Sequence, residues 1–572
     1  MVRRVPHQLD EQPLDSAVID DAHLGDIRGA FGTVRWRQLW LPRTGRRRLR
    51  VLATVMGPGV LALVADNDAG GVATYAQAGQ EQGTRLLWLL IPLGAVLFLN
   101  QEMAARLGTV TGVGHARLIF ERFGRLWGAF SLGDLLLLNV LTLVTEFIGV
   151  RIAAEHVGIP ARPAVAVAAL LLIAATLGGG FQRWERVMYM LVALDVALVP
   201  LLLFAHPAAV AGGGATMQMP EVQPTVLLIV ALMGTTVAPW QLFFQQSAVV
   251  DKRITPRWMS YARLDTAVGT VLMLGGAAAV MVVSAAASGG GPGTVRAEFD
   301  MGGVLNGVGA HAGPVFGNLL AVLLFDGALL GAAAVAMATS YAIGDVSGAR
   351  HSLHRTPRQA PVFYLVSTLV IAATAGVVLL PGVPLGFTTA AVQVLAGLLL
   401  PSATVFMLLL CNDTAVLGPW ANGRWLNATV ATMLAALLAL SGMLVVTALY
   451  PRAPAVTVGA VLSGVAAAGL LAVGVSGALR RRRSARLLLT DPAATPHLAL
   501  LRPSHVVVIP PRGRDLAPLE DERSFWRTPP LTELRRPVWS TGRLVGMLAL
   551  RAYLVVSVLL LAGRAVATAL GH

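Results

Sequence analysis

Hydrophobic residues run along the chain in stretches of about 20, and short polar segments between them carry most of the arginines. A helix needs about 20 apolar residues to cross a bilayer, so each stretch predicts a membrane span. A weaker stretch at 541–569 is interrupted by Arg551 and Arg564, and we interpret it as an interfacial helix rather than a span. The twelve predicted spans lie at residues 52–78, 85–108, 129–153, 162–180, 186–206, 223–249, 262–287, 315–345, 361–380, 387–411, 427–449 and 455–478.

Composition agrees with this pattern. The chain is 55% hydrophobic and 13% charged, whereas a soluble domain is about 25% charged. The net charge of +14 does not indicate a nucleic-acid partner, because the arginines stand at the ends of apolar stretches. The single cysteine, Cys411, excludes a disulfide within the chain. The fold class is therefore an all-α polytopic membrane protein with the lipid bilayer as its surroundings.

Basic residues in the short loops predict the orientation. "RTGRRRLR", which ends at Arg50, precedes the first span and predicts a cytoplasmic N-terminus. Every second loop after it is rich in basic residues, up to "RRRR" at 480–483. We expect a disordered cytoplasmic tail at 1–45, a ten-span core at 46–411, two additional spans at 412–479, and a cytoplasmic tail at 480–572 that ends in an amphipathic or membrane helix. Trp184 and Glu185 are expected to begin the fifth span as an interfacial anchor and an N-terminal charge.

Two spans are interrupted near their middle. The first contains "ADNDAGG" at 65–71, in which Gly70 and Gly71 permit backbone angles that a continuous helix does not use. The sixth contains "GTTVAP", and Pro239 predicts a helix break just before it. Unwound backbone at membrane depth survives only when protein buries it or when it lines a wet cavity. Two breaks, each opening a group of five spans, indicate a secondary transporter with inverted repeats.

At these residues the sequence resembles the NRAMP family of divalent-metal transporters. The resemblance runs in order from about residue 50 to 450, and it implies a LeuT-type fold with 5+5 inverted repeats. The matching stretches are "GPG" at 57–59, "ATYAQAG" at 73–79, "QEMAARLGTVTG" at 101–112, "TEFIG" at 145–149, "RWE" at 183–185, "GTTVAPWQLFFQQS" at 234–247, "VQVLAGLLLP" at 392–401 and "CND" at 411–413.

The departures from the family pattern bear on the ion. The family's D-P-G-N stands here as Asp68-Ala69-Gly70-Gly71, and its M-P-H stands as Ala238-Pro239-Trp240. A thioether is a soft ligand that favours transition metals, so Ala238 leaves a site with oxygen ligands only. Mg²⁺ dehydrates reluctantly and binds through few carboxylates. The pattern is similar to that of the NRAMP-related magnesium transporters, and Mn²⁺ stays open as a substrate because it also accepts oxygen ligands.

The resemblance implies a set of ligands. Asp68 is expected to supply the carboxylate, Ala65 and Thr235 their carbonyls, and Gln393 its amide. The expected lining without direct ligation comprises Gly71, Ala238, Asp66, Asn67, Trp240 and Gln241.

Proton coupling in the family uses an acidic pair on the third span and the sixth-span histidine. Here Leu143 replaces the first acid and Trp240 replaces the histidine, whereas Glu146 is retained as a gating or structural acid. Because proton transfer through a membrane needs a chain of titratable groups, we expect Mg²⁺ transport by alternating access without proton coupling. The expected place is the plasma membrane, with a divalent metal ion as substrate and without a cofactor. For Asp326, in the eighth span, an aqueous vestibule and a helix cap are both open.

Four other functions compete with this one. A proton-coupled Mn²⁺ or Fe²⁺ symporter of the same family is disfavoured by Ala238 and Trp240. An amino-acid transporter of the same fold is disfavoured because Asp66 and Asp68 would repel a substrate carboxylate. A metal-dependent enzyme is disfavoured because the sequence contains no H-E-x-x-H motif or comparable arrangement. A channel or metal sensor would differ from a transporter in lacking saturable flux.

Overall fold

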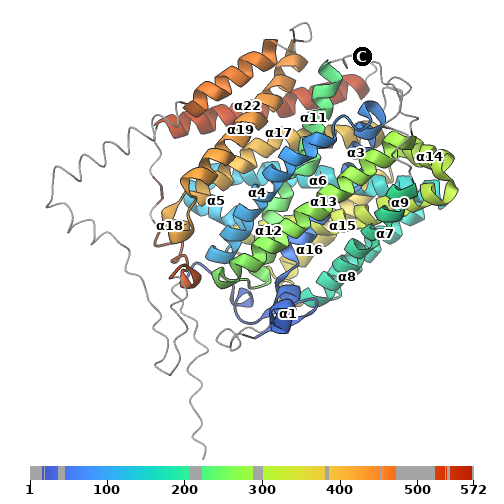
Figure 1. The fold of residues 1–572 in the computed structure, drawn as a ribbon. Helices are drawn as coiled ribbons and strands as arrows, with labels where there is room; N and C mark the ends of the chain where they lie inside the picture. The colour runs from blue at the N-terminus through green and yellow to red at the C-terminus, as the bar shows by residue number, and fades with distance from the viewer. Residues whose placement is uncertain are drawn as a thin grey trace, which may run out of the picture.

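The computed structural model is a bundle of long helices that run roughly side by side (Figure 1). It describes residues 16–18, 20–35, 45–204, 222–287, 301–380, 385–450, 454, 457–471, 522–534, 536–537 and 541–569. Each of the twelve predicted apolar stretches contains a helix. Among the described residues, nine helices are long and apolar enough to cross a membrane, and the shorter apolar ones include Ala161–Leu177 and Thr457–Leu471.

The elements are numbered in their order along the chain. The strands are β1 (Ile27–Gly29) and β2 (Gly32–Val34), and the 3₁₀ turns include η1 (Asp21–His23), η4 (Asp195–Ala197) and η8 (Glu522–Phe525). The helices are α1 (Gly45–Val55), α2 (Pro58–Val64), α3 (Ala69–Gln82), α4 (Leu90–Thr111), α5 (His115–Phe123), α6 (Arg125–His156), α7 (Ala161–Leu177), α8 (Phe181–Leu194), α9 (Leu198–Phe204), α11 (Val222–Thr236), α12 (Pro239–Asp251), α13 (Met259–Ala287), α14 (Met301–Ala312), α15 (Pro314–Ser347), α16 (Pro361–Val378), α17 (Leu385–Cys411), α18 (Thr414–Leu417), α19 (Arg424–Leu449) and α22 (Thr541–Ala569).

The two interrupted spans lie inside the bundle. The first span is α2 followed by α3, and α13 packs along both helices. The sixth span is α11 followed by α12; α11 packs against α17, and α12 packs against α4 and α15. In the most apolar stretch of the sixth span 89% of the residues are buried, against 22% in Arg424–Val446. The sixth span is therefore central, and α19 is peripheral.

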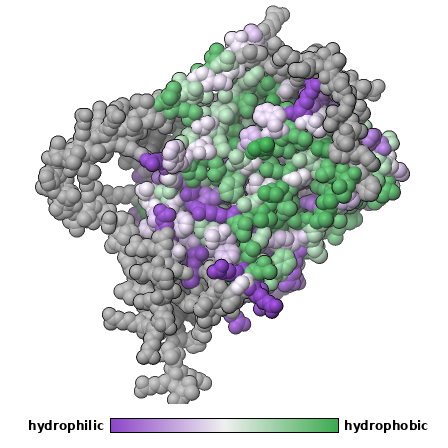
Figure 2. All heavy atoms as spheres, viewed as in Figure 1, coloured by the Kyte–Doolittle hydropathy of each residue, from purple (hydrophilic) through white to green (hydrophobic). Residues whose placement is uncertain are grey.

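The outer helices present hydrophobic side chains to the surroundings. Leu170, Leu203 and Val271 are 65%, 70% and 70% exposed. Figure 2 shows a broad hydrophobic face over this part of the bundle, with hydrophilic residues gathered toward its lower edge. Exposed leucine and valine on a broad apolar face are expected where lipid rather than water covers the helices.

The expectation of a disordered tail at 1–45 is wrong for residues 20–35. These residues form η1 and a small antiparallel hairpin in which Ile27 pairs with Val34 and Gly29 pairs with Gly32. Ile27 and Val34 are buried against Val51 and Val55 of α1, because the hairpin directs its apolar side chains toward that helix. Residues 1–15 and 36–44 lie outside the described residues.

Glu185 differs from the expected interfacial charge. Its side chain is buried, and its Oε1 lies 2.5 Å from Lys252 Nζ in an ion pair. Burial alone would raise the energy of either charge, so the two groups offset one another's desolvation. Trp184 beside it is also buried, at 4% exposure.

The C-terminal part of the chain returns to the bundle. Residues 522–534 pack over helix ends, where Trp420 Nε1 donates to Arg523 O at 2.8 Å and Thr528 Oγ1 donates to Val416 O at 2.8 Å. In Figure 1, α22 crosses the upper side of the bundle, and it packs against α17 and α19. The interpretation of this last helix as interfacial stays a prediction, and most of the 480–540 tail lies outside the described residues.

Candidate metal-binding site at the two helix breaks

The first span breaks where the sequence predicts. α2 ends at Val64, α3 begins at Ala69, and Asp68 is the N-cap of α3 with an extended backbone. Its Oδ1 accepts a hydrogen bond from Gly71 N at 2.6 Å. An aspartate is a strong N-cap because its oxygen satisfies an amide that the helix leaves free, and its charge suits the positive end of the helix dipole.

The two glycines serve a different purpose from the predicted one. Gly70 and Gly71 are helical, within the first turn of α3, and neither has a positive φ. A Cβ on Gly70 would overlap the Gln393 side-chain amide, and a Cβ on Gly71 would lie 2.5 Å from the Asp66 carbonyl oxygen. The glycines therefore let α17 and the unwound backbone between α2 and α3 pack closely against the first turn of α3. Their role is in packing and not in backbone conformation.

The sixth span breaks just before Pro239, as predicted. α11 ends at Thr236, Ala238 is extended with φ −78° and ψ 136°, and Pro239 is the first residue of α12. Proline suits this first position because the amide it lacks has no partner there. The last carbonyls of α11, including that of Thr235, also lose their helical partners at the break.

The structure brings the breaks together. The Thr235 hydroxyl and Asp68 Oδ1 each lie 3.3 Å from the point where a Gly71 Cβ would stand. Tyr75 OH on α3 and Thr236 Oγ1 on α11 are 2.9 Å apart. Asp68, Thr235 and Gln393 are 3%, 2% and 4% exposed. The carboxylate, hydroxyl and amide thus share one buried region between α3, α11 and α17.

Glu146 joins this region from α6. Its Oε2 accepts from Ala69 N at 3.0 Å, so two acids bind the first amides of α3. A Cβ on Gly331 of α15 would lie 2.7 Å from Asp68 Cβ and 3.1 Å from Glu146 Cδ, which places both acids against the same glycine. Within the described chain, Glu146 Oε1 has no hydrogen-bond partner. Glu146 is therefore a positioning acid for α3 with one oxygen left for a further contact.

The expected lining residues divide into two groups. Asn67 turns toward α13, where its Nδ2 donates to Met273 O at 3.3 Å. Gln241 lies beside the Asp66 carboxylate, and its Oε1 accepts from Gln101 Nε2 at 3.0 Å. Among the described residues, Asp66 Oδ2 and Gln241 Nε2 are buried without a hydrogen-bond partner. Gln101 was missed by sequence reasoning, although a glutamine inside the second span is itself a signal of function.

The sixth-span substitutions leave a methyl group and an indole at the break. Ala238 is 5% exposed and Trp240 is 1% exposed, with the Trp240 ring edge-on to Phe244 at 6.3 Å between centroids. No three side chains of the types His, Cys, Asp and Glu gather as metal ligands in the part of the chain that the structure describes. A metal ion at the breaks would thus be bound by carboxylate, amide, hydroxyl and carbonyl oxygens, a donor set that hard cations prefer.

Asp326 has no place in this region. It is 2% exposed, and neither of its carboxylate oxygens has a hydrogen-bond partner among the described residues. Its charged neighbour is Asp195, in the η4 turn that interrupts the fifth span. The structure therefore favours neither an aqueous vestibule nor a helix cap for Asp326.

A helical membrane protein whose first and sixth spans are broken and face one another belongs to the class of inverted-repeat transporters. The family model described as "Natural resistance-associated macrophage protein-like" matches residues 59–447. The chain therefore belongs to the NRAMP family, and the resemblance seen in the sequence is confirmed.

Relatives and solved structures agree with this assignment. The divalent metal cation transporter MntH 1 of Pseudomonas aeruginosa is 28% identical over 398 residues, which cover 66% of this chain and 88% of that protein. MntH of Ralstonia nicotianae is 28% identical over 404 residues, which cover 68% and 89%. A crystal structure of the Eremococcus coleocola manganese transporter has a TM-score of 0.57 at 19% identity and covers 77% of this chain and 97% of that one. This likeness confirms the predicted all-α, LeuT-type fold.

Proposed function

We propose that the chain transports divalent metal ions across the plasma membrane, with Mg²⁺ as its substrate and Mn²⁺ also accepted. The observation that carries the proposal is the cluster of oxygen donors at the two breaks. Asp68 supplies one charge, and Thr235 and Gln393 supply neutral oxygens, within a buried region. The carbonyl of Ala65, the C-cap residue of α2, is proposed as a further donor. An ion that keeps part of its water shell fits such a set, because bound waters can satisfy Asp66 Oδ2 and Gln241 Nε2.

Selectivity follows from position 238. A methionine sulfur there would favour softer transition metals, and the methyl group of Ala238 offers no donor. Mn²⁺ remains a second substrate because it accepts oxygen ligands as well.

Transport proceeds without proton coupling in this proposal. Leu143 on α6 is fully buried and apolar, and Trp240 cannot carry a proton at neutral pH. A divalent ion gains about 4.6 kcal/mol per 100 mV of inside-negative potential, twice the value for a unit charge. With the N-terminus in the cytoplasm, as the arginine-rich loops favour, this energy drives uptake by alternating access.

A proton-coupled Mn²⁺ or Fe²⁺ symporter of the same family is the second candidate. It is favoured by the relatives, whose names denote divalent-metal and manganese transport. Glu146, buried with one oxygen unpartnered within the described chain, is the residue through which protons would have to pass. The two candidates differ in selectivity and in proton movement.

Flux into proteoliposomes that contain a pH dye separates them. We expect saturable, voltage-driven uptake of Mg²⁺, slower uptake of Mn²⁺, and no acidification of the lumen with either ion. Acidification that depends on the metal would establish the symporter. Mn²⁺ uptake in the absence of Mg²⁺ uptake would overturn the proposed selectivity, and flux that does not saturate would indicate a channel.

A further inference from the structure

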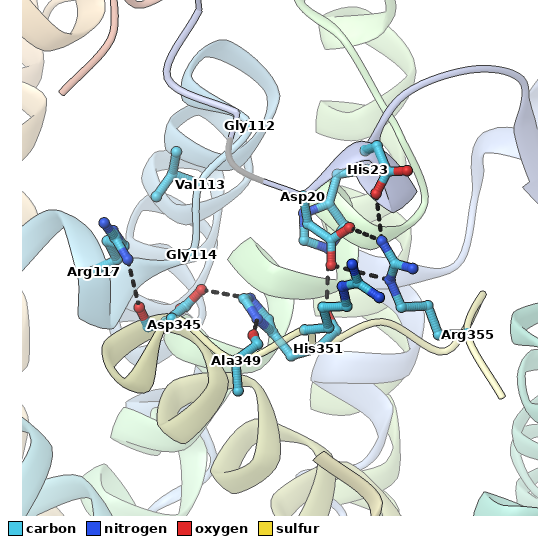
Figure 3. A pocket seen from close by; sticks show the side chains of 13 residues that line it. Asp20, His23, Gly112, Val113, Gly114, Arg117, Asp345, Ala349, His351 and Arg355 are labelled. Atoms are coloured by element: carbon cyan, nitrogen blue, oxygen red, sulfur yellow. Dashed lines mark hydrogen bonds and ion pairs between the residues drawn. The ribbon is translucent and has the colours of Figure 1, made fainter. Parts of the chain in front are cut away.

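The described part of the N-terminal segment, residues 16–18 and 20–35, crosses the ends of several spans, and we call it the N-terminal clasp. At one end it binds the loop that follows α15. Arg355 pairs with both Asp20 and Asp21, and His23 Nε2 lies 3.3 Å from His351 O. Figure 3 shows these side chains converging over a cavity of about 280 Å³ whose other lining includes Arg117 and Asp345.

The middle of the clasp binds the end of the sixth span. Arg253 donates from Nε to Ala22 O at 2.8 Å and from Nη1 to Asp26 O at 3.2 Å. Arg253 has a φ of +65°, and within the described chain it is the one residue other than glycine with a positive φ. This backbone conformation is costly for a side chain with a Cβ, so its contacts with the clasp help to hold it. His23 Nε2 also lies 3.9 Å from the buried Asp251 carboxylate at the end of α12.

The hairpin of the clasp binds the start of the fifth span. Ala30 N donates to Glu185 Oε2 at 2.5 Å, and Arg186 Nε donates to Ala30 O at 3.0 Å. Gln182 Nε2 donates to Gly29 O at 3.2 Å. Three side chains in the first two turns of α8 thus bind the backbone of the hairpin.

The same hairpin lies on α1, the helix that leads into the first span. Gly29 packs directly on Thr54 O, where a Cβ would overlap the carbonyl, and Ile27 and Val34 pack on α1. Lys252 connects the neighbouring elements, because its Nζ donates to Met56 O as well as to Glu185. The clasp therefore touches α1 just before the first span, the start of the fifth span, the end of the sixth span and the loop after the eighth, all at one end of the bundle.

We propose that the N-terminal clasp closes the transport pathway at this end, and that the clasp must release before the pathway opens there. The inference rests on the proposed transport by alternating access, in which one group of spans moves against another around a fixed site. A segment that joins α1 and the end of the sixth span to the fifth span and to the loop after the eighth opposes such movement. Apart from the apolar packing of Ile27 and Val34, its contacts are single hydrogen bonds and ion pairs, most of them partly buried, and each contributes only about 0.5–1.5 kcal/mol net. The clasp can therefore release without unfolding the bundle.

A reversible cross-link tests the proposal. In a Cys411→Ala background, which removes the chain's single cysteine, Asp21→Cys and Arg355→Cys place thiols where the ion pair stood. A short cross-linker that contains a disulfide holds the clasp in place. We expect metal flux in proteoliposomes to fall at least about tenfold, corresponding to about 1.4 kcal/mol, and to recover after reduction. The matched control is Asp21→Cys alone with the same reagent. Unchanged flux in the cross-linked protein would overturn the proposal.

A second experiment loosens the clasp and needs no substrate. Thr54→Cys places a thiol under the hairpin, where Thr54 is 3% exposed. We expect Arg355→Ala to raise the rate of thiol labelling several-fold, and Arg358→Ala, an exposed arginine in the same loop, to leave it unchanged. Equal labelling rates in the two variants would contradict the clasp. If the wild-type protein transports no divalent metal, the proposed function is overturned, but the labelling experiment still tests the clasp.

Discussion

Asp66 and Asp251 are both buried aspartates, at 1% and 0% exposure, but their surroundings differ. Asp251, at the end of the sixth span, accepts hydrogen bonds from Tyr341 OH at 2.6 Å, Ser352 Oγ at 2.5 Å and Leu353 N at 2.9 Å. Asp66, at the break of the first span, lies beside Gln241, and its Oδ2 has no hydrogen-bond partner among the described residues.

The difference separates a structural region from a binding region. A buried polar atom without a partner costs about 1–3 kcal/mol, so such an atom needs an explanation, and a ligand that pairs with it is one. At the end of the bundle that the N-terminal clasp covers, Asp251 and the Glu185–Lys252 pair have protein partners for their charges and hold the spans together. The breaks leave oxygens and amides with unused capacity at the place where a hydrated cation would supply the partners.

The largest effect is expected at Asp68. Asp68→Asn keeps a good helix cap but removes the charge, so the fold should survive while the cation loses its carboxylate. We expect Mg²⁺ flux in proteoliposomes to fall at least about 100-fold, equivalent to about 2.7 kcal/mol. Asp134→Asn, which changes an aspartate of α6 near Arg551, is the control and should transport normally. If Asp68→Asn retains its flux, the cation site does not lie at the two breaks.

The stability of the fold should distinguish Asp66 from Asp251. In Asp251→Asn an amide replaces an acceptor of three hydrogen bonds, and we expect a loss of about 1–3 kcal/mol and a lower melting temperature. Asp66→Asn removes a buried charge that lacks full pairing, so its melting temperature should stay the same or rise. Thermal unfolding of the purified proteins without metal gives both values. Equal destabilisation by the two substitutions would contradict the division into structural and binding regions.

Ion preference should respond to the sixth-span break. Ala238→Met restores a thioether, and we expect the ratio of Mn²⁺ to Mg²⁺ flux to rise about tenfold, because sulfur favours transition metals. Ala231→Met, within α11, is the control for an added side chain. The first break does not offer a matching change, since a side chain at Gly71 would meet the Asp66 carbonyl. An unchanged ratio would show that ligand softness at position 238 does not set the selectivity.

The smallest effect is expected from pH on the clasp. Burial lowers the pKa of His23 below its ordinary 6.5, although Asp251, Asp20 and Asp345 act in the other direction; His351 adds to the lowering. The closed clasp therefore favours neutral His23. As pH falls below about 6.5, the equilibrium constant for closure of the clasp decreases, by at most about tenfold per pH unit. His351, whose pKa Asp345 raises to about 9 against the effect of burial, stays charged throughout this range.

Labelling of Thr54→Cys between pH 8 and 5 measures this effect. Each rate is divided by that of the same protein carrying His23→Gln, which removes the pH dependence of the thiol itself. The ratio should rise on acidification. A ratio that is constant with pH, or that falls, would exclude His23 as the titrating group.

The sequence predicts the fold and the breaks because both depend on local rules. Apolar stretches of membrane length mark the spans, and Pro239 marks the sixth-span break by removing a helical donor. The location of the first break was also predicted, but Gly70 and Gly71 prove to make room for Gln393 and the Asp66 carbonyl. That role depends on a helix more than 300 residues away in the chain, which a single sequence does not reveal.

The clasp could not be predicted for a related reason. Its strands have three residues each, "IRG" and "GTV", too few to show an alternating pattern. Its partners are also distant in sequence, as with Ala30 and Glu185, which are 155 residues apart. Acidic residues in a polar segment usually indicate a solvated tail, and here Asp20 and Asp21 pair with Arg355 of the loop after α15, which the fold brings beside them.

The central claim is that a divalent cation binds between the two breaks, and anomalous diffraction tests it most directly. Mn²⁺ soaked into crystals of the full chain serves as the scatterer in place of Mg²⁺. The account predicts one strong peak beside Asp68, facing Thr235 and Gln393, that disappears in Asp68→Asn. A strong peak elsewhere in the bundle, with none beside Asp68, would contradict it.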